Sequence, residues 1–322
     1  SYMAGAAAWL GQAFLDQEDF RKAEKWYERA LQISPDPAYY QGLGLSLMYQ
    51  ERYDPAKESL QRAYDAYCEA NDLSGQAASL SSHAAIEMKK GEIEAALKKM
   101  EKIAEIMRQL GDLQGEAQAL QETARLEMMT SNFDSARQRL QRSLELLESS
   151  GDPRGAAFAL FNLASLDLEK GDFQVAAEEY ARALPLFRAM EDRAAVSAIR
   201  HSQGLIQAQA GEKELATSSF KEALAINQDL GDKAAEAGSF FQLGAMAVQQ
   251  DRMEEGLKLM ATAAVVLRSI KSDEVKNVEP LVERLASRLN YSQEQFMVMV
   301  QEVLKGYSKD RGWGLVERAS GK

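Results

Sequence analysis

Apolar and small residues recur along this chain at spacings of three and four, which place side chains on one face of an α-helix. A small residue returns after one step of 33 and then every 40 residues, at Ala23, Ala56, Ala96, Ala136, Ala176, Ala216 and Gly256. A larger apolar or aromatic residue follows each by four positions: Tyr27, Leu60, Met100, Leu140, Tyr180, Phe220 and Met260. The pattern predicts seven copies of one amphipathic helix.

A second amphipathic helix precedes each copy, and its closest-packing position is again small: Gly11, Gly44, Ala84, Ala124, Ala164, Gly204 and Gly244. An Asp separates successive units at Asp72, Asp112, Asp152, Asp192 and Asp232, preceded by Gly111, Gly151 and Gly231 or by Asn71 and Glu191. Gly adopts the left-handed backbone that ends a helix, and Asp accepts hydrogen bonds from the free N–H groups that start the next. Each unit is therefore predicted to be an antiparallel helical hairpin.

The residues of one unit, "WLGQAFLDQEDFRKAEKWYERALQISPD" at 9–36, closely resemble the tetratricopeptide repeat (TPR) family. The 40-residue spacing and "ALFNLASLDLEKGDF" at 159–173 are similar to the longer variant found in kinesin light chains, Pins-type polarity scaffolds and bacterial Rap-type regulators. The resemblance implies an all-α fold, a right-handed α-solenoid of seven hairpins whose concave surface is lined by the first helix of each.

We expect three parts along the chain. Residues 1–272 are predicted to hold the seven repeats, at about 4–36, 37–76, 77–116, 117–156, 157–196, 197–236 and 237–272. Residues 273–307 are predicted to form C-terminal capping helices, and the charged, Gly-containing residues 308–322 a flexible tail. The helix at 293–307 is apolar on a broad face, which suits either docking on the last repeat or joining a second copy of the chain.

Charge and hydropathy narrow the class of partner. The chain has 38 Lys and Arg against 49 Asp and Glu, a net charge of −11, which argues against nucleic acid and anionic membrane. No apolar run approaches the roughly 18 residues that span a bilayer, so membrane insertion is not expected. A cytoplasmic location is the default expectation, and a periplasmic or exported form stays open.

Candidate chemistry is sparse. The two histidines, His83 and His201, fall in different repeats and lack neighbours at metal-ligand spacing, and Cys68 is the single cysteine. No phosphate-binding loop is present. We therefore expect no enzyme activity, no cofactor, no catalytic residue and no metal site. His83 is predicted to be a buried, hydrogen-bonded packing residue. Arg200 and Gln203 replace apolar residues that would face a neighbouring helix. Either the helices pack more loosely around these two side chains, or a polar pair or a ligand satisfies them.

The family resemblance implies binding of a peptide or helical segment in the concave groove. The positions that the family turns inward give a mixed aromatic and amide surface at Gln118, Gln121, Glu122, Arg125, Phe158, Phe161, Asn162, His201, Phe241 and Gln242. The lysines and asparagines that would clamp a terminal carboxylate are absent. Two alternatives remain open: the phenylalanines pack only against adjacent helices, or the chain is not an adaptor but a self-assembling structural protein or the sensing module of a regulator.

Overall fold

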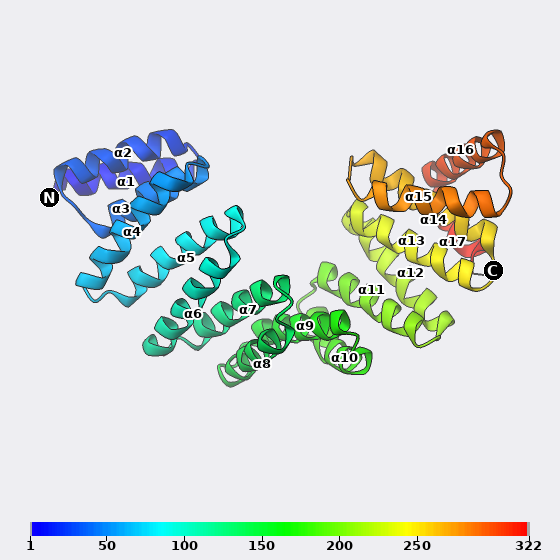
Figure 1. Cartoon of the computed structure of the whole chain (residues 1–322), viewed down its shortest axis with the longest axis horizontal. Helices are drawn as coiled ribbons and strands as arrows, with labels where there is room; N and C mark the ends of the chain where they lie inside the picture. Colours follow the sequence, from blue (N-terminus) through cyan, green and yellow to red (C-terminus); the bar gives the residue numbers. More distant parts are fainter. Residues whose placement is uncertain (1, 321–322) are drawn as a thin grey trace. The chain divides into compact units, whose positions relative to one another are not determined.

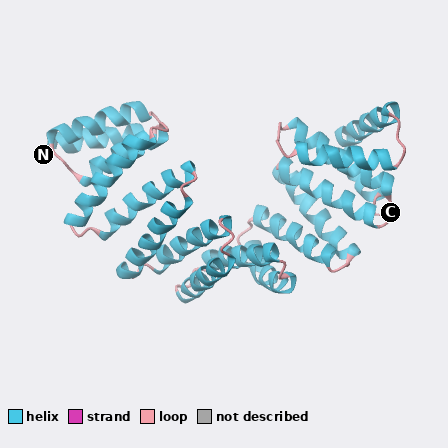
Figure 2. Cartoon of the chain, viewed as in Figure 1, coloured by secondary structure: helices cyan, strands magenta, loops and turns pink. Residues whose placement is uncertain are grey.

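A computed structural model of the chain describes residues 2–320, and over that range it consists of helices and loops without a strand (Figure 2). Contacts between residues divide the chain into two compact units, residues 1–162 (unit 1) and residues 163–322 (unit 2). The boundary lies inside helix α9 (Pro153–Lys170).

Unit 1 is a stack of helices in chain order, each contacting the next (Figure 1). Its helices before α9 are α1 (Tyr2–Asp16), α2 (Phe20–Ile33), α3 (Pro37–Tyr49), α4 (Tyr53–Glu69), α5 (Leu73–Lys90), α6 (Ile93–Leu110), α7 (Leu113–Met129) and α8 (Phe133–Ser149). The odd-numbered helix of each pair is the first helix of a hairpin, as the sequence predicts.

Unit 2 continues the same pattern and then departs from it. Its paired helices after α9 are α10 (Phe173–Ala189), α11 (Arg193–Gln209), α12 (Lys213–Leu230), α13 (Lys233–Gln249) and α14 (Met253–Ser269). They are followed by α15 (Val275–Arg288), α16 (Gln293–Asp310) and the short α17 (Trp313–Arg318), all three of which contact α14. The all-α solenoid of seven hairpins followed by C-terminal helices is therefore confirmed for the described residues.

The junctions between hairpins have the local structure that the sequence predicts. The Asp at each junction caps the following helix, as where the Asp112 carboxylate accepts a hydrogen bond from the Gly115 backbone N–H at 2.9 Å. Gly111 has φ +71°, and Glu191, which stands in for Gly, is held at φ +56°. From the second hairpin onward, one residue with positive φ and one capping Asp thus turn the chain from each hairpin into the next.

Glycine in the first helices permits close helix packing, which confirms another prediction. A Cβ atom on Gly44 of α3 would lie 2.6 Å from Cγ of Leu60 on α4, and one on Gly204 of α11 would lie 2.6 Å from the Phe220 ring on α12. Real atoms do not approach so closely, so the observed spacing of these helices requires glycine.

The C-terminal helices share one apolar core with the last repeats. Val282 of α15, Val303 of α16 and Val316 of α17 are buried in a cluster that also contains Phe240 of α13. Helix α16 begins with a capping box, in which Ser292 and Gln295 each bond the other's backbone N–H. Unit 2 therefore covers the end of its repeats with segments of its own.

The flexible tail predicted for residues 308–322 is not what the structure shows up to Ser320. Helix α16 runs on to Asp310, and Leu315 and Val316 of α17 are buried. Gly312 has φ +84°, and a Cβ there would lie 2.7 Å from the Phe240 ring, so this glycine serves close packing rather than flexibility. Residues 321–322 lie outside the described residues.

Candidate peptide-binding surface

The predicted surface residues lie on first helices and fall in both units. Gln118, Gln121, Glu122 and Arg125 are on α7, and Phe158, Phe161 and Asn162 are on the part of α9 within unit 1. His201 is on α11, and Phe241 and Gln242 are on α13, in unit 2. Gln118, Arg125 and Phe158 are exposed and the other seven are half-buried, so every one of the ten keeps some surface in contact with solvent.

Two amide side chains of unit 1 meet between α7 and α9. Asn162 donates from Nδ2 to Oε1 of Gln121 at 3.5 Å, and Gln121 donates from Nε2 to Oγ of Ser143 on α8 at 3.1 Å. Ser143 in turn donates to the Ala117 backbone carbonyl at 3.0 Å. This chain of hydrogen bonds fixes how both amides are presented. Within the described residues, Asn162 keeps one N–H and its Oδ1 without a protein partner.

The charged pair of this surface is neutral overall. Arg125 contacts the Glu122 carboxylate at 3.0 Å, and its guanidinium also lies 3.9 Å from the sulfur of Met88 on α5. Both charged side chains are close to half exposed, and such pairs contribute at most about 1 kcal/mol. Either partner is therefore able to exchange this contact for one with a ligand at little cost.

The aromatic residues do not behave alike. Phe158 is 36% exposed, whereas Phe161 is half-buried. Phe241 packs against the apolar core of unit 2. For Phe241 the structure thus shows the packing role that the sequence left open, while Phe158 presents much of its ring to solvent.

His201 lies beside a hollow that the sequence did not predict. Its ring meets Phe220 edge-on at 5.3 Å between centroids, and burial lowers the pKa of the imidazole. The hollow, of about 370 Å³, is also lined by Asn227 and Gly238. The sequence feature that could have predicted the hollow is Gly238, because the corresponding positions of the earlier repeats carry the larger residues Ala198, Phe158 and Gln118.

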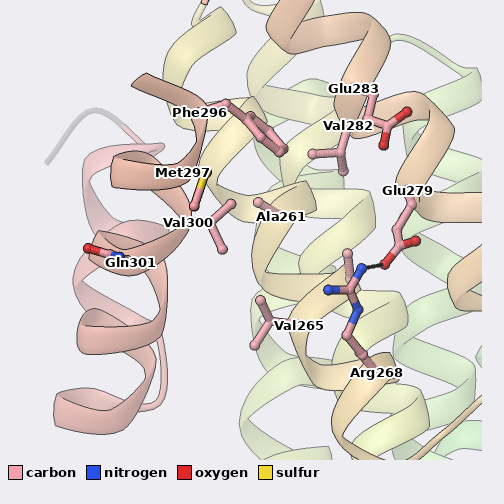
Figure 3. Close-up of a pocket in the computed structure, with 11 residues that line it drawn as sticks. Ala261, Val265, Arg268, Glu279, Val282, Glu283, Phe296, Met297, Val300 and Gln301 are labelled. Carbon is pink, nitrogen blue, oxygen red and sulfur yellow. Dashed lines mark hydrogen bonds and ion pairs between the residues drawn. The ribbon is translucent and has the colours of Figure 1, made fainter. Parts of the chain in front are cut away.

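A second apolar hollow, of about 300 Å³, lies among α14, α15 and α16 (Figure 3). Ala261, Val282, Phe296 and Val300 point into it, and an ion pair between Arg268 and Glu279 closes one side. The sequence predicted the broad apolar face of α16 but not this cavity, because the cavity depends on how α15 and α16 sit on α14.

The structure places the polar residues Arg200, Gln203 and His83, whose surroundings the sequence left open. Arg200 donates to Oε1 of Gln203 at 3.0 Å, and its Nε forms an ion pair with Glu222 at 2.8 Å that lacks hydrogen-bond geometry. An internal polar pair is thus present at this interface, although within the described part of the chain Nε of Arg200 keeps no hydrogen bond. His83 is buried as predicted, but its expected hydrogen bond is not found: among the described residues neither ring nitrogen has a partner. Burial, reinforced by Lys99, lowers the pKa of His83.

The described residues form neither a metal-binding cluster nor a membrane-spanning helix. Between residues 2 and 320, no group of three or more His, Cys, Asp or Glu side chains is placed to hold a metal ion. Over the same residues, none of the helices combines the length and apolar character needed to cross a bilayer.

The stacked hairpins define a helical-repeat protein, and family comparisons specify the repeat. Residues 4–37 and 75–149 match models described as tetratricopeptide repeat. Residues 123–204 and 202–237 match a model described as anaphase-promoting complex subunit 5. The chain therefore contains tetratricopeptide repeats over these ranges, and repeats of this kind are generally interaction modules without catalytic groups of their own.

Among curated proteins, Protein POLLENLESS 3-LIKE 2 of Arabidopsis thaliana is 47% identical over 53 residues, which are 16% of this chain. The match spans only 12% of that protein. The likeness therefore concerns a short segment.

Three solved structures are similar over most of the chain. A signal transduction ATPase with numerous domains and a tetratricopeptide repeat sensor, from Pyrococcus horikoshii, has a TM-score of 0.72 at 19% identity, covering 85% of this chain and 44% of that one. The quorum sensor NprR from B. thuringiensis, in its apo form, has a TM-score of 0.63 at 12% identity, covering 98% and 90%. The apo form of RapI has a TM-score of 0.58 at 16% identity, covering 83% and 98%. At these identities they establish a common fold.

Proposed function

We propose that this chain is a non-enzymatic adaptor that binds a peptide or helical segment through the first helices of its hairpins. The residues proposed to make contact are Gln118, Gln121, Glu122, Arg125, Phe158, Phe161 and Asn162 in unit 1, and His201, Phe241 and Gln242 in unit 2.

The observation that supports this proposal most directly is the surface formed by α7 and α9 in unit 1. Gln121 and Asn162 are held by hydrogen bonds and retain unused polar atoms, and Phe158 exposes apolar area on the same helix as Asn162. Oriented amides can hydrogen-bond an extended backbone, while an exposed ring gives contact area. An enzyme site would require convergent acid, base or nucleophilic groups, which this surface does not offer.

The similar structures support a sensing or recognition role without naming a ligand. Two of them are described as a quorum sensor and as an ATPase carrying a tetratricopeptide repeat sensor. A sensing module of a larger regulator is the variant of this proposal in which ligand binding is passed on to another domain.

The test is selection of peptides from a displayed random library on the intact chain, followed by affinity measurement. The variant Arg125→Ala/Phe161→Ala/Asn162→Ala should lose at least about tenfold in affinity, because it removes a charge, a ring and an oriented amide from one surface. The double variant Arg142→Ala/Glu145→Ala, which alters exposed residues of α8, is the control and should bind as the parent does. Circular dichroism checks that helix content is equal.

Equal peptide affinity of the triple variant and the parent would show that these residues of unit 1 are not part of the binding surface. A chain that captures no peptide at all would count against the adaptor function itself.

A second candidate function is self-assembly through α16. Met297 is 58% exposed, Val298 51% and Leu304 44%, although the same helix already buries Met299 and Val303 in the core. An apolar face left uncovered beside the hollow of Figure 3 is the kind of surface that joins copies of a chain.

A further inference from the structure

The hollow between α11, α12 and α13 has an apolar wall and a polar base within unit 2. Its volume is about 370 Å³, in the range of small-ligand sites. Ala198 of α11, Ala235 of α13 and the exposed Leu230 of α12 supply apolar lining. The backbone of Gly238 completes the lining.

Glycine at 238 is not required by the fold. A Cβ there would meet only Cε1 of His201, at 3.9 Å, which is an ordinary contact, and the backbone is helical rather than left-handed. Glycine within a helix is less favourable than alanine because it loses more conformational freedom on folding. This glycine therefore costs stability without easing any contact. A residue as small as glycine or alanine here leaves the hollow open, at a position where the repeat two units earlier carries Phe158.

The polar base is already oriented. Asn227 is 4% exposed, and its Oδ1 accepts a hydrogen bond from Ser197 at 2.5 Å while its Nδ2 donates to Ser239 at 3.4 Å. His201 is half-buried at the side of the hollow, and among the described residues its ring nitrogens have no hydrogen-bond partner. Because burial lowers its pKa, the imidazole is neutral near pH 7 and offers one donor and one acceptor.

The charge of the lining selects against ionised ligands. Asp232 is the single charged lining residue, and its carboxylate accepts the Ala235 backbone N–H at 3.0 Å as the cap of α13. The lining contains no Lys or Arg to pair with an acidic side chain, and a lone capping carboxylate is a weak attraction for a basic one.

We propose that this hollow is a specificity pocket for one uncharged, apolar side chain of a bound peptide, with His201 hydrogen-bonding the adjacent peptide backbone. The inference rests on the adaptor function proposed above and adds to it the chemistry of the ligand. Gly238 and Ala198 are the residues that set which side chain fits.

The test uses blocked single amino acids, the N-acetyl N-methylamides of leucine, lysine and glutamate, added to the full chain with methyl-labelled alanine. In NMR spectra the leucine compound should shift the Ala198 and Ala235 methyl signals saturably, and the lysine and glutamate compounds should not. Gly238→Leu should weaken this binding about tenfold or more, because the new side chain occupies the space. Gly238→Ala should keep binding within about twofold and raise thermal stability.

The matched control is Gly306→Leu, a change at a helical glycine of α16 that has nothing within 4 Å of its Cβ position and does not line the hollow. It should bind the leucine compound as the parent does. If Gly238→Leu fails to fold, Ala198→Leu fills the hollow from α11 and carries the same expectation.

Absence of saturable shifts at Ala198 and Ala235 in the folded parent, or equal binding by the parent and the folded Leu variants, overturns the pocket. Library peptides that bind the parent and Gly238→Leu alike would also overturn it, while leaving the adaptor function intact. Binding of the leucine compound in the hollow, with no library peptide captured, supports the pocket and counts against the adaptor function.

Discussion

At the residue scale, Tyr27 of α2 packs tightly against glycines on both neighbouring helices. A Cβ on Gly11 of α1 would lie 3.0 Å from the Tyr27 ring, and one on Gly42 of α3 would lie 2.2 Å from it. The ring fills the space that three helices leave between them. Its fit depends on the missing side chains of its neighbours.

Gly42→Ala should therefore destabilise unit 1 by about 1–3 kcal/mol, because the added methyl forces the ring or a helix to move. Gly5→Ala in α1 is the matched control, since its Cβ would have nothing within 4 Å, and it should stabilise the chain by up to about 1 kcal/mol. Urea unfolding of both variants measures the difference. Equal stability of the two would show that the Tyr27 contact is not a constraint.

Because the pKa of His83 is lowered by burial, we expect this residue to make the free energy of unfolding smaller at low pH. Its imidazole is buried among Glu87 of its own helix, Lys57 of α4 and Lys99 of α6, and its pKa lies below the ordinary 6.5. Below pH 6.5 the unfolded chain binds a proton at this histidine while the folded chain stays neutral, so protons favour unfolding. Stability should fall as pH drops from 6.5 toward the folded pKa and change no further from this residue below it.

The measurement compares urea midpoints of the parent and His83→Gln between about pH 7 and pH 5. The variant should show the weaker dependence on pH. His201, whose pKa is also lowered by burial, remains in both proteins and does not affect the comparison. Parallel curves for the two proteins would contradict the role of His83.

At the element scale, polar groups of α12 and α13 hold the C-terminal segment that runs from the end of α16 into α17. The Trp313 indole donates to Oε1 of Gln228 at 2.8 Å, and the Tyr307 hydroxyl donates to the buried Glu236 at 2.9 Å. Arg311 also donates to the Gln228 backbone carbonyl at 2.8 Å. The end of α12 and the start of α13 thus bind the C-terminal segment through polar groups, while Phe240 binds it through apolar ones.

A chain ending at residue 310 should lose about 3 kcal/mol or more of unfolding free energy, because Leu315 and Val316 together leave the core. Glu317→Ala, which alters an exposed residue of the same helix, is the control and should change stability by less than about 0.5 kcal/mol. Hydrogen exchange in α13 should quicken in the shortened chain alone. Unchanged exchange there would mean that α17 does not support the repeats.

The packing of this helix could not be predicted from the sequence. The hairpins and their junctions were predictable because each depends on residues close in sequence, such as Asp112 and Gly115. Whether residues 308–320 pack on the repeats depends on contacts with Gln228 and Phe240, more than 70 positions away. A charged sequence that contains glycine has the same local pattern whether the segment is packed or flexible. The ten candidate surface residues were predictable as positions on first helices, whereas the hollow beside His201 depends on three helices meeting.

At the scale of the whole molecule, the uncovered face of α16 predicts self-association. Sedimentation at rising concentration should show dimers of the parent, and Met297→Glu/Leu304→Glu should remain monomeric, because charges placed on an apolar face oppose its burial. Lys309→Glu, a change on the exposed end of the same helix, controls for added negative charge. A parent that stays monomeric at high concentration would exclude assembly through this face.

The regular turns between hairpins favour changes in chain length by whole repeats. From the second hairpin onward, each turn to the next hairpin has one left-handed residue and one capping Asp, and both return with a period of 40 residues. Because stability in repeat arrays comes largely from neighbours, duplicating or deleting one whole period would recreate the same local joints. Tandem duplication of one 40-residue period in the gene can therefore extend this protein by a complete hairpin in one event.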